Sequence, residues 1–188
     1  MALRASKTKK ITLPGPPPPP GNRLCVPVSA QDQNQWCWAA CAEMILKYYN
    51  ETGIRQCDLA NLAFADAGGG CCRVPSSSLC DKQLSDPQIG QLFDTKAVRI
   101  HYHYTAGSVP FAILQNEIDN YRPVQIGVTR RGGGHVAIIQ GWFTTQMEEY
   151  LIVNDPAPDV GQGTVSFKDL ETANSLRTWD ATWTELTR

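Results

Sequence analysis

The segment from Gln31 to Tyr49 places a cysteine, Cys37, at the start of an amphipathic helical pattern. We expect a helix over residues 36–49, so Cys37 would lie where the first backbone N–H groups have no helical partner. These groups and the helix dipole stabilise a thiolate, the reactive form of cysteine. The amide of Gln31 is suited to donate a hydrogen bond to an oxyanion that forms beside the sulfur. The competing interpretation is a structural cysteine in a buried helix start.

A second pattern supplies a base for this cysteine. His135 follows a run of glycines and begins an apolar run rich in Val and Ile, which predicts a buried strand. The next apolar run, residues 150–153, predicts an antiparallel neighbour that ends at Asn154 and Asp155, before a proline. One of these two side chains would accept a hydrogen bond from the second ring nitrogen of His135. The set then contains a nucleophile, a base and a group that orients the base.

These motifs resemble the papain-like cysteine peptidases, most closely their compact bacterial branch of bacteriocin-leader peptidases and secreted effector proteases of plant pathogens. The resemblance spans residues 26–156. The chain departs from the plant enzymes in lacking Cys-Gly-Ser-Cys-Trp, because Gln35 and Trp36 precede its cysteine. Fewer residues separate Cys37 from His135 than the roughly 130–150 of the papain type. The loops that form substrate pockets are therefore expected to be trimmed, and specificity does not transfer.

The resemblance implies a role for each residue of the set. Gln31 would complete the oxyanion hole, and Cys37 and His135 would form a thiolate–imidazolium pair. The compact bacterial branch has Asp followed by Pro at the third position, which favours Asp155 over Asn154 as the residue that orients the imidazole. The two residues remain alternatives at this point, because both would end the same strand.

The predicted activity is hydrolysis of peptide bonds through a thioester intermediate, with a protein or peptide as the substrate. Glutamine deamidases and transglutaminase-like enzymes use the same catalytic residues, and a non-catalytic binding module on this scaffold is a further alternative. Residues expected to contact the substrate or shield the site are Trp36, Trp38, Gly134 and Trp142. We predict no cofactor and no metal site, because the cysteine spacings are not those of zinc-binding pairs.

Periodicity predicts an α+β, papain-like fold in which an N-terminal helical half, with the cysteine helix, packs on an antiparallel sheet carrying His and Asp. Further helices are expected at residues 56–64, 85–93 and 108–121. A half-buried strand is expected at residues 98–104, and the main strand set begins at residue 123. The folded domain is assigned to residues 24–188.

Residues 1–23 form a basic, proline-rich arm that cannot pack into a core. We expect it to be disordered, or to join the domain to a larger polypeptide; as written, it is not a secretory signal peptide. The net charge of −1 gives no reason to expect nucleic acid as a partner. No apolar run is long enough for insertion into a membrane.

Besides Cys37, the chain has an even number of cysteines. They are Cys25, Cys41, Cys57, Cys71, Cys72 and Cys80. At least two disulfides are expected among them, with the adjacent Cys71 and Cys72 bonded to different partners and Cys37 left as the free thiol. Disulfides would indicate a secreted or extracytoplasmic protein; reduced cysteines in the cytoplasm are the alternative. Zinc coordination by these cysteines is a weaker interpretation of the same residues.

Overall fold

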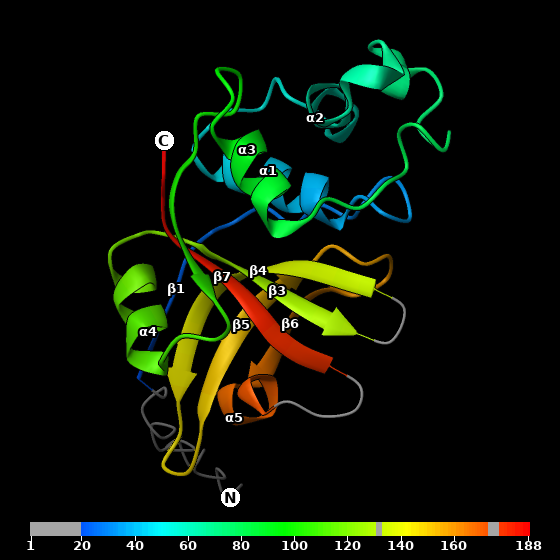
Figure 1. The fold of residues 1–188 in the computed structure, drawn as a ribbon. Coiled ribbons are helices and arrows are strands. Elements are labelled where there is room, and N and C mark those ends of the chain that lie inside the picture. Colours follow the sequence, from blue (N-terminus) through cyan, green and yellow to red (C-terminus); the bar gives the residue numbers. More distant parts are fainter. Residues whose placement is uncertain (1–19, 131–132, 173–176) are drawn as a thin grey trace, which may run out of the picture.

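The computed structural model describes residues 20–130, 133–172 and 177–188, and it has the expected α+β architecture. Three helices lie on one side of a curved antiparallel sheet, and two more helices lie beside and below it (Figure 1). The helices are α1 (Cys37–Tyr48), α2 (Gln56–Ala63), α3 (Asp86–Phe93), α4 (Phe111–Asp119) and α5 (Phe167–Glu171), with single 3-10 turns at Ala65–Ala67 and Gly70–Cys72.

Among the described residues, seven strands pair antiparallel in the order β2-β7-β3-β4-β5-β6, and β1 pairs with the far part of β4. Their bounds are β1 (Gly21–Arg23), β2 (His101–Ala106), β3 (Val124–Arg130), β4 (Gly133–Thr144), β5 (Glu149–Asp155), β6 (Gly161–Ser166) and β7 (Arg177–Thr187). Because β4 and β5 are antiparallel neighbours, the beginning of β4 and the end of β5 meet at one edge of the sheet.

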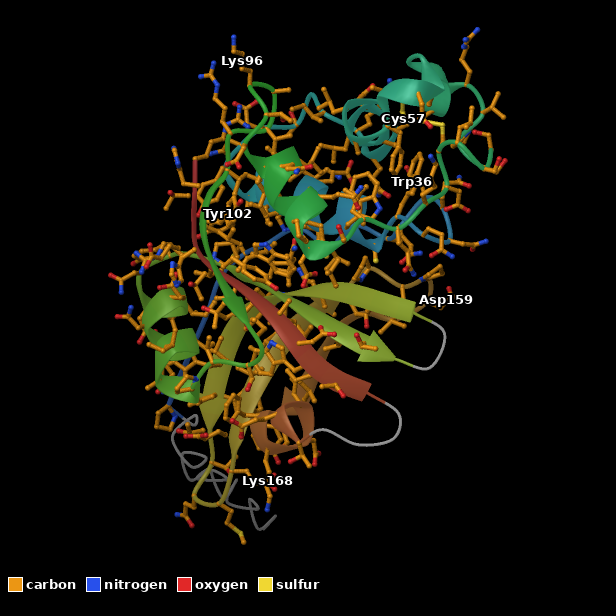
Figure 2. The ribbon with its side chains drawn as sticks, viewed as in Figure 1. Trp36, Cys57, Lys96, Tyr102, Asp159 and Lys168 are labelled. Carbon is orange, nitrogen blue, oxygen red and sulfur yellow. A yellow bond between two sulfur atoms is a disulfide. The ribbon has the colours of Figure 1, made fainter. Side chains whose placement is uncertain are left out.

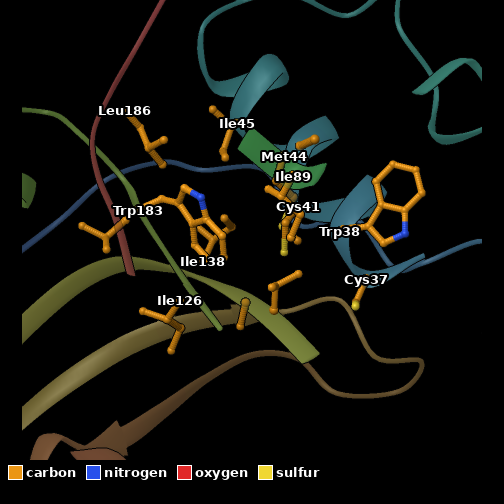
Figure 3. Packing of buried hydrophobic residues seen from close by; sticks show 14 of the residues in the cluster. Cys37, Trp38, Cys41, Met44, Ile45, Ile89, Ile126, Ile138, Trp183 and Leu186 are labelled. Carbon is orange, nitrogen blue, oxygen red and sulfur yellow. The ribbon is translucent and has the colours of Figure 1, made fainter. Parts of the chain in front are cut away.

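The core lies between α1 and the middle of the sheet. Nine of the twelve residues of α1 are buried, and residues 136–141 of β4 are buried in succession. Figure 3 shows Cys41, Met44 and Ile45 of α1 in the same cluster as Ile138 of β4. Burial on both faces explains why β4 appears in the sequence as a continuous apolar run rather than an alternating one.

Two predicted elements differ from the structure for local reasons. Val98 and Ile100 are buried as expected, but β2 begins only at His101. Arg99, which separates them, has a φ of +48°, so the chain there is not extended. Likewise, α4 begins at Phe111, after Pro110 in an extended conformation, and not at residue 108.

The boundary of the N-terminal arm also needs correction. Residues 21–23, assigned to the arm, form β1 and pair with β4. Residues 1–19 lie outside the described part of the chain. No helix within the described residues is sufficiently long and apolar to span a lipid bilayer.

The structure contains two disulfides, as the cysteine content predicts. Cys57 bonds Cys72, and Cys71 bonds Cys80, so the adjacent cysteines do have different partners. The expectation that Cys37 alone remains a free thiol is wrong. Cys25 is exposed and unpaired, and Cys41 is unpaired inside the core. Asp58 lies near the sulfurs of Cys57 and Cys72, but those sulfurs bond each other, which leaves no thiolate to bind a metal.

Candidate active site

The structure brings together three of the residues expected at the site. Cys37 is the first residue of α1, His135 lies at the beginning of β4, and Asp155 ends β5. Nε2 of His135 is 2.6 Å from Oδ1 of Asp155. Cys37 also interacts with the imidazole, by hydrogen bonding and by charge, and raises its pKa. We assign this interaction to Nδ1, because Nε2 faces the carboxylate. The ring thus lies between the thiol and the carboxylate.

The surroundings of His135 favour its charged form. Burial of the ring opposes charge and lowers its pKa, but hydrogen bonds and charge interactions with Asp155 and Cys37 outweigh this effect. The net result raises the pKa of His135 from 6.5 to about 9. The side chains of His135 and Asp155 are only 11% and 16% exposed, so solvent screens their interaction little. At neutral pH this histidine is an imidazolium.

The N-terminus of α1 is left open for an anion. Its N-cap residue, Trp36, makes no side-chain capping hydrogen bond, and the first turn contains no acidic residue. In contrast, the first turns of α2, α3 and α5 contain Asp58, Asp86 and Asp169. The positive end of the α1 dipole and its first N–H groups therefore act on the sulfur of Cys37 without a competing carboxylate.

Gln31 lies in the loop before α1, and its amide is engaged within that loop. The amide nitrogen donates to the carbonyl oxygens of Gln33 and Asn34 at 2.8 and 2.7 Å. The backbone N–H of Gln31 donates to the carbonyl of Pro156 at 2.8 Å. The loop that precedes the cysteine is therefore fastened to the chain just after Asp155.

Asn154, the alternative to Asp155, is fully buried and faces away from the imidazole. Its side-chain oxygen accepts from Nε2 of Gln140 at 2.6 Å, and its side-chain nitrogen donates to the carbonyl of Val26 at 3.1 Å. Adjacent residues of a strand point to opposite faces, so only one of the two side chains can reach His135. In this structure Asp155 does.

The tryptophans predicted near the substrate have different positions. Trp36 is completely buried, so it cannot contact a substrate. Trp142 is seven residues along β4 from His135, and its indole donates to Asp119 at 3.0 Å, so it does not cover the His–Asp hydrogen bond. Both assignments are therefore corrected. Trp38 borders the cleft described next, although little of its surface is exposed.

A cleft of about 420 Å³ opens beside Cys37 and His135. Part of its lining is apolar and comes from Leu84, Ile89 and Val128. Its carboxylates are Asp86, which accepts a hydrogen bond from Tyr104 at 3.0 Å, and Asp180, which accepts one from Thr129.

Gly134 also borders the cleft, and a Cβ atom there would meet nothing within 4 Å. Besides residues of α1 and β4, the side chains that line the cleft come from α3, β2, β3, β7 and the segment before α3. They were not anticipated, because no sequence motif marks side chains that only tertiary packing brings together.

Comparisons with known proteins show what this fold is similar to. The peptidase domain of Streptococcus ComA, a bifunctional ABC transporter in a quorum-sensing pathway, has a TM-score of 0.55 and 16% identity, and covers 85% of this chain and 98% of its own. A structure from work on the mite allergens Blo t 1 and Der p 1 has a TM-score of 0.55 and 15% identity, and the match covers 96% of this chain and 75% of that one.

Digestive procathepsin L 3 of Tenebrio molitor larval midgut has a TM-score of 0.51 and 12% identity, and the match covers 85% of this chain and 66% of that one. At these identities the likeness concerns the fold. No curated protein sequence matches the chain. The profile of the family described as papain-like cysteine protease AvrRpt2 matches residues 21–173, most of the chain. The chain therefore belongs to this family of papain-like cysteine proteases.

Proposed function

We propose that the protein hydrolyses peptide bonds through a thioester intermediate, with Cys37 as the nucleophile, His135 as the acid and base, and Asp155 as the residue that orients the imidazole. One observation carries this proposal. The imidazole of His135 contacts the carboxylate of Asp155 at 2.6 Å, and it also interacts with the thiol of Cys37, which raises its pKa. This is the geometry that an activated nucleophile requires.

The reaction follows from these contacts. The Cys37 thiolate attacks the carbonyl carbon of the scissile peptide bond and forms a tetrahedral intermediate. The imidazolium of His135 then donates its Nδ1 proton to the departing amine, and the acyl group remains on the sulfur as a thioester. The neutral imidazole next takes a proton from a water molecule, which attacks the thioester carbonyl. The C–S bond breaks, the Cys37 thiolate leaves, and the carboxylic acid is released. Asp155 keeps the ring in one orientation throughout.

The oxyanion of each tetrahedral intermediate needs donors. We assign the first to the backbone N–H of Cys37, since the N-terminus of α1 is uncapped. The second is the side-chain amide of Gln31, which would exchange one of its two hydrogen bonds within the loop for one to the oxyanion. The position of Gln31, in the loop that precedes the nucleophile, supports this assignment.

The cleft favours a substrate side chain without negative charge. Leu84, Ile89 and Val128 offer an apolar surface, and the carboxylates of Asp86 and Asp180 repel an acidic group. We further propose that the enzyme works outside the cytoplasm, because its two disulfides persist in an oxidising compartment.

A peptide library digested by the wild-type protein, with Cys37→Ala as the control, tests the function. New termini that appear only with the wild type are expected, and acidic residues should be depleted next to the cleaved bond. Mass spectrometry of the same mixture also detects a gain of about one dalton at glutamine, the signature of a deamidase. Deamidation without new termini would replace the peptidase assignment.

A further inference from the structure

The segment between α2 and α3 has little apolar anchorage of its own. Among residues 65–84, called here the cystine loop, only Cys71 and Cys80 are buried. The Cys71–Cys80 disulfide closes the loop on itself, and Cys57–Cys72 attaches it to α2. Figure 2 shows Cys57 and Trp36 on the side of the helical layer where this loop lies. The position of the loop therefore depends largely on its disulfides.

Three consecutive residues of the cystine loop accept hydrogen bonds from residues on both sides of the nucleophile. The carbonyl of Cys80 accepts from the indole N–H of Trp36 at 2.8 Å, and the carbonyl of Lys82 accepts from that of Trp38 at 3.0 Å. Between them, Oδ1 of Asp81 accepts from the backbone N–H of Gln35 at 2.8 Å. The two tryptophans are buried and flank the nucleophile, so loss of an acceptor would leave a buried donor unsatisfied.

We propose that the Cys71–Cys80 disulfide positions Cys37 through this segment, that Asp81 is a positioning residue, and that the oxidised disulfide is required for full reactivity of the nucleophile. The inference rests on the proposed role of Cys37. A dithiol reductant would transfer two electrons and two protons to the disulfide, giving two thiols and its own cyclic disulfide. Cys80 would then be free to move, and with it the neighbouring acceptors that fasten the start of α1.

The structure offers a matched control in the second disulfide. The sulfur of Cys72 contacts Arg55, Asp58 and Asn61, which lie in α2 or directly before it. Within the described residues, no hydrogen bond joins Cys57 or Cys72 to residues 35–38. Loss of this bond removes a cross-link of the same kind without touching the contacts that hold the nucleophile.

The first experiment compares C71S/C80S with C57S/C72S. The readouts are the alkylation rate of Cys37 by iodoacetamide, followed on its own peptide, and kcat and KM for a responsive substrate. We expect C71S/C80S to lower the alkylation rate and kcat by about tenfold or more with little change in KM. C57S/C72S should lower the melting temperature yet keep both rates near the wild type. Wild-type rates in folded C71S/C80S, or equal losses in both variants, would overturn the proposal.

Asp81 gives a test that does not depend on removing a disulfide. Asp81→Ala should slow alkylation of Cys37 and lower kcat, whereas Asp81→Asn, which retains an acceptor oxygen for Gln35, should restore both. Unchanged alkylation and kcat in Asp81→Ala would reject the positioning role, even where C71S/C80S fails to fold. The alkylation readout separates this inference from the proposed function: a loop-dependent alkylation rate without peptide cleavage would keep the positioning role and reject the peptidase.

Discussion

His135 and Asp155 meet at one edge of the sheet because β4 begins where its antiparallel neighbour β5 ends, and their side chains are joined by a 2.6 Å contact. The carboxylate occupies Nε2, so the ring presents Nδ1 to Cys37 across the boundary between sheet and helices. Asp155 also accepts from the backbone N–H of Ala157 at 2.9 Å, which fixes the carboxylate. The orientation of the base is thus set by backbone pairing and by a local turn.

Replacement of the nucleophile should separate activity from stability. Cys37→Ala is expected to abolish peptide cleavage and keep the fold. Cys41 provides the control, because it lies one turn further along α1, fully buried. Cys41→Ala should retain cleavage while lowering the free energy of unfolding by about 1 kcal/mol. Kinetic assays measure cleavage by both variants, and urea denaturation measures their stability. Persistent cleavage by Cys37→Ala would show that Cys37 is not the nucleophile.

The adjacent residues at the end of β5 should have opposite phenotypes. Asp155→Ala is expected to lower kcat by about 10²-fold or more, because the imidazole loses the group that orients and charges it. Asn154→Ala should cost roughly 1–3 kcal/mol of stability, because its partners Gln140 and Val26 would lose buried hydrogen bonds, with a smaller effect on kcat. The same assays measure both variants. A greater loss of kcat in Asn154→Ala would exchange their roles.

Strong periodic patterns allowed most of the architecture to be predicted. The helix at residues 36–49 and the apolar strands after residues 123 and 135 have enough buried side chains to define their type. β7, however, lies between β2 and β3 and was not predicted. Its residues 177–187 mix Thr, Trp and charged side chains, so pairing on both sides, more than apolar content, makes it a strand. β1 is too short to have a sequence signature and depends on pairing with β4.

The site was predictable only where a residue type carries its own chemistry. Cys37 and His135 could be found from their reactivity and their positions at element starts, but whether Asp155 or Asn154 faces the ring depends on strand register, which a resemblance could only favour. Trp36 illustrates the opposite case. A tryptophan beside a nucleophile suggests a substrate contact, yet its indole is buried against the carbonyl of Cys80. Disulfide partners were also beyond reach, because six cysteines allow about 15 connectivities.

Counting thiols should distinguish three kinds of free cysteine. In the denatured, unreduced protein, alkylation should occur at Cys25, Cys37 and Cys41 and at no disulfide cysteine. In the native protein, Cys41 should be protected, because burial and the neighbouring charges of Cys37 and Asp155 raise the pKa of its thiol well above the ordinary value. Peptide mapping after each treatment measures this pattern. Seven alkylated positions in the unreduced protein would remove both disulfides and the argument for an oxidising compartment.

The charge of His135 should also make activity and stability depend on pH. Its pKa is about 9 in the folded protein and 6.5 ordinarily, so the imidazolium contributes stability that is complete below 6.5 and is lost as the pH rises through about 9. The same proton is needed for the departing amine, so kcat/KM should fall above pH about 9. Asp155→Asn removes the negative charge that stabilises the protonated imidazole, so the alkaline fall of kcat/KM should move to lower pH. Denaturation and kcat/KM profiles across this range, with His135→Ala as the stability control, measure both effects. If the alkaline fall of kcat/KM occurs at the same pH in Asp155→Asn, the group that titrates is not His135.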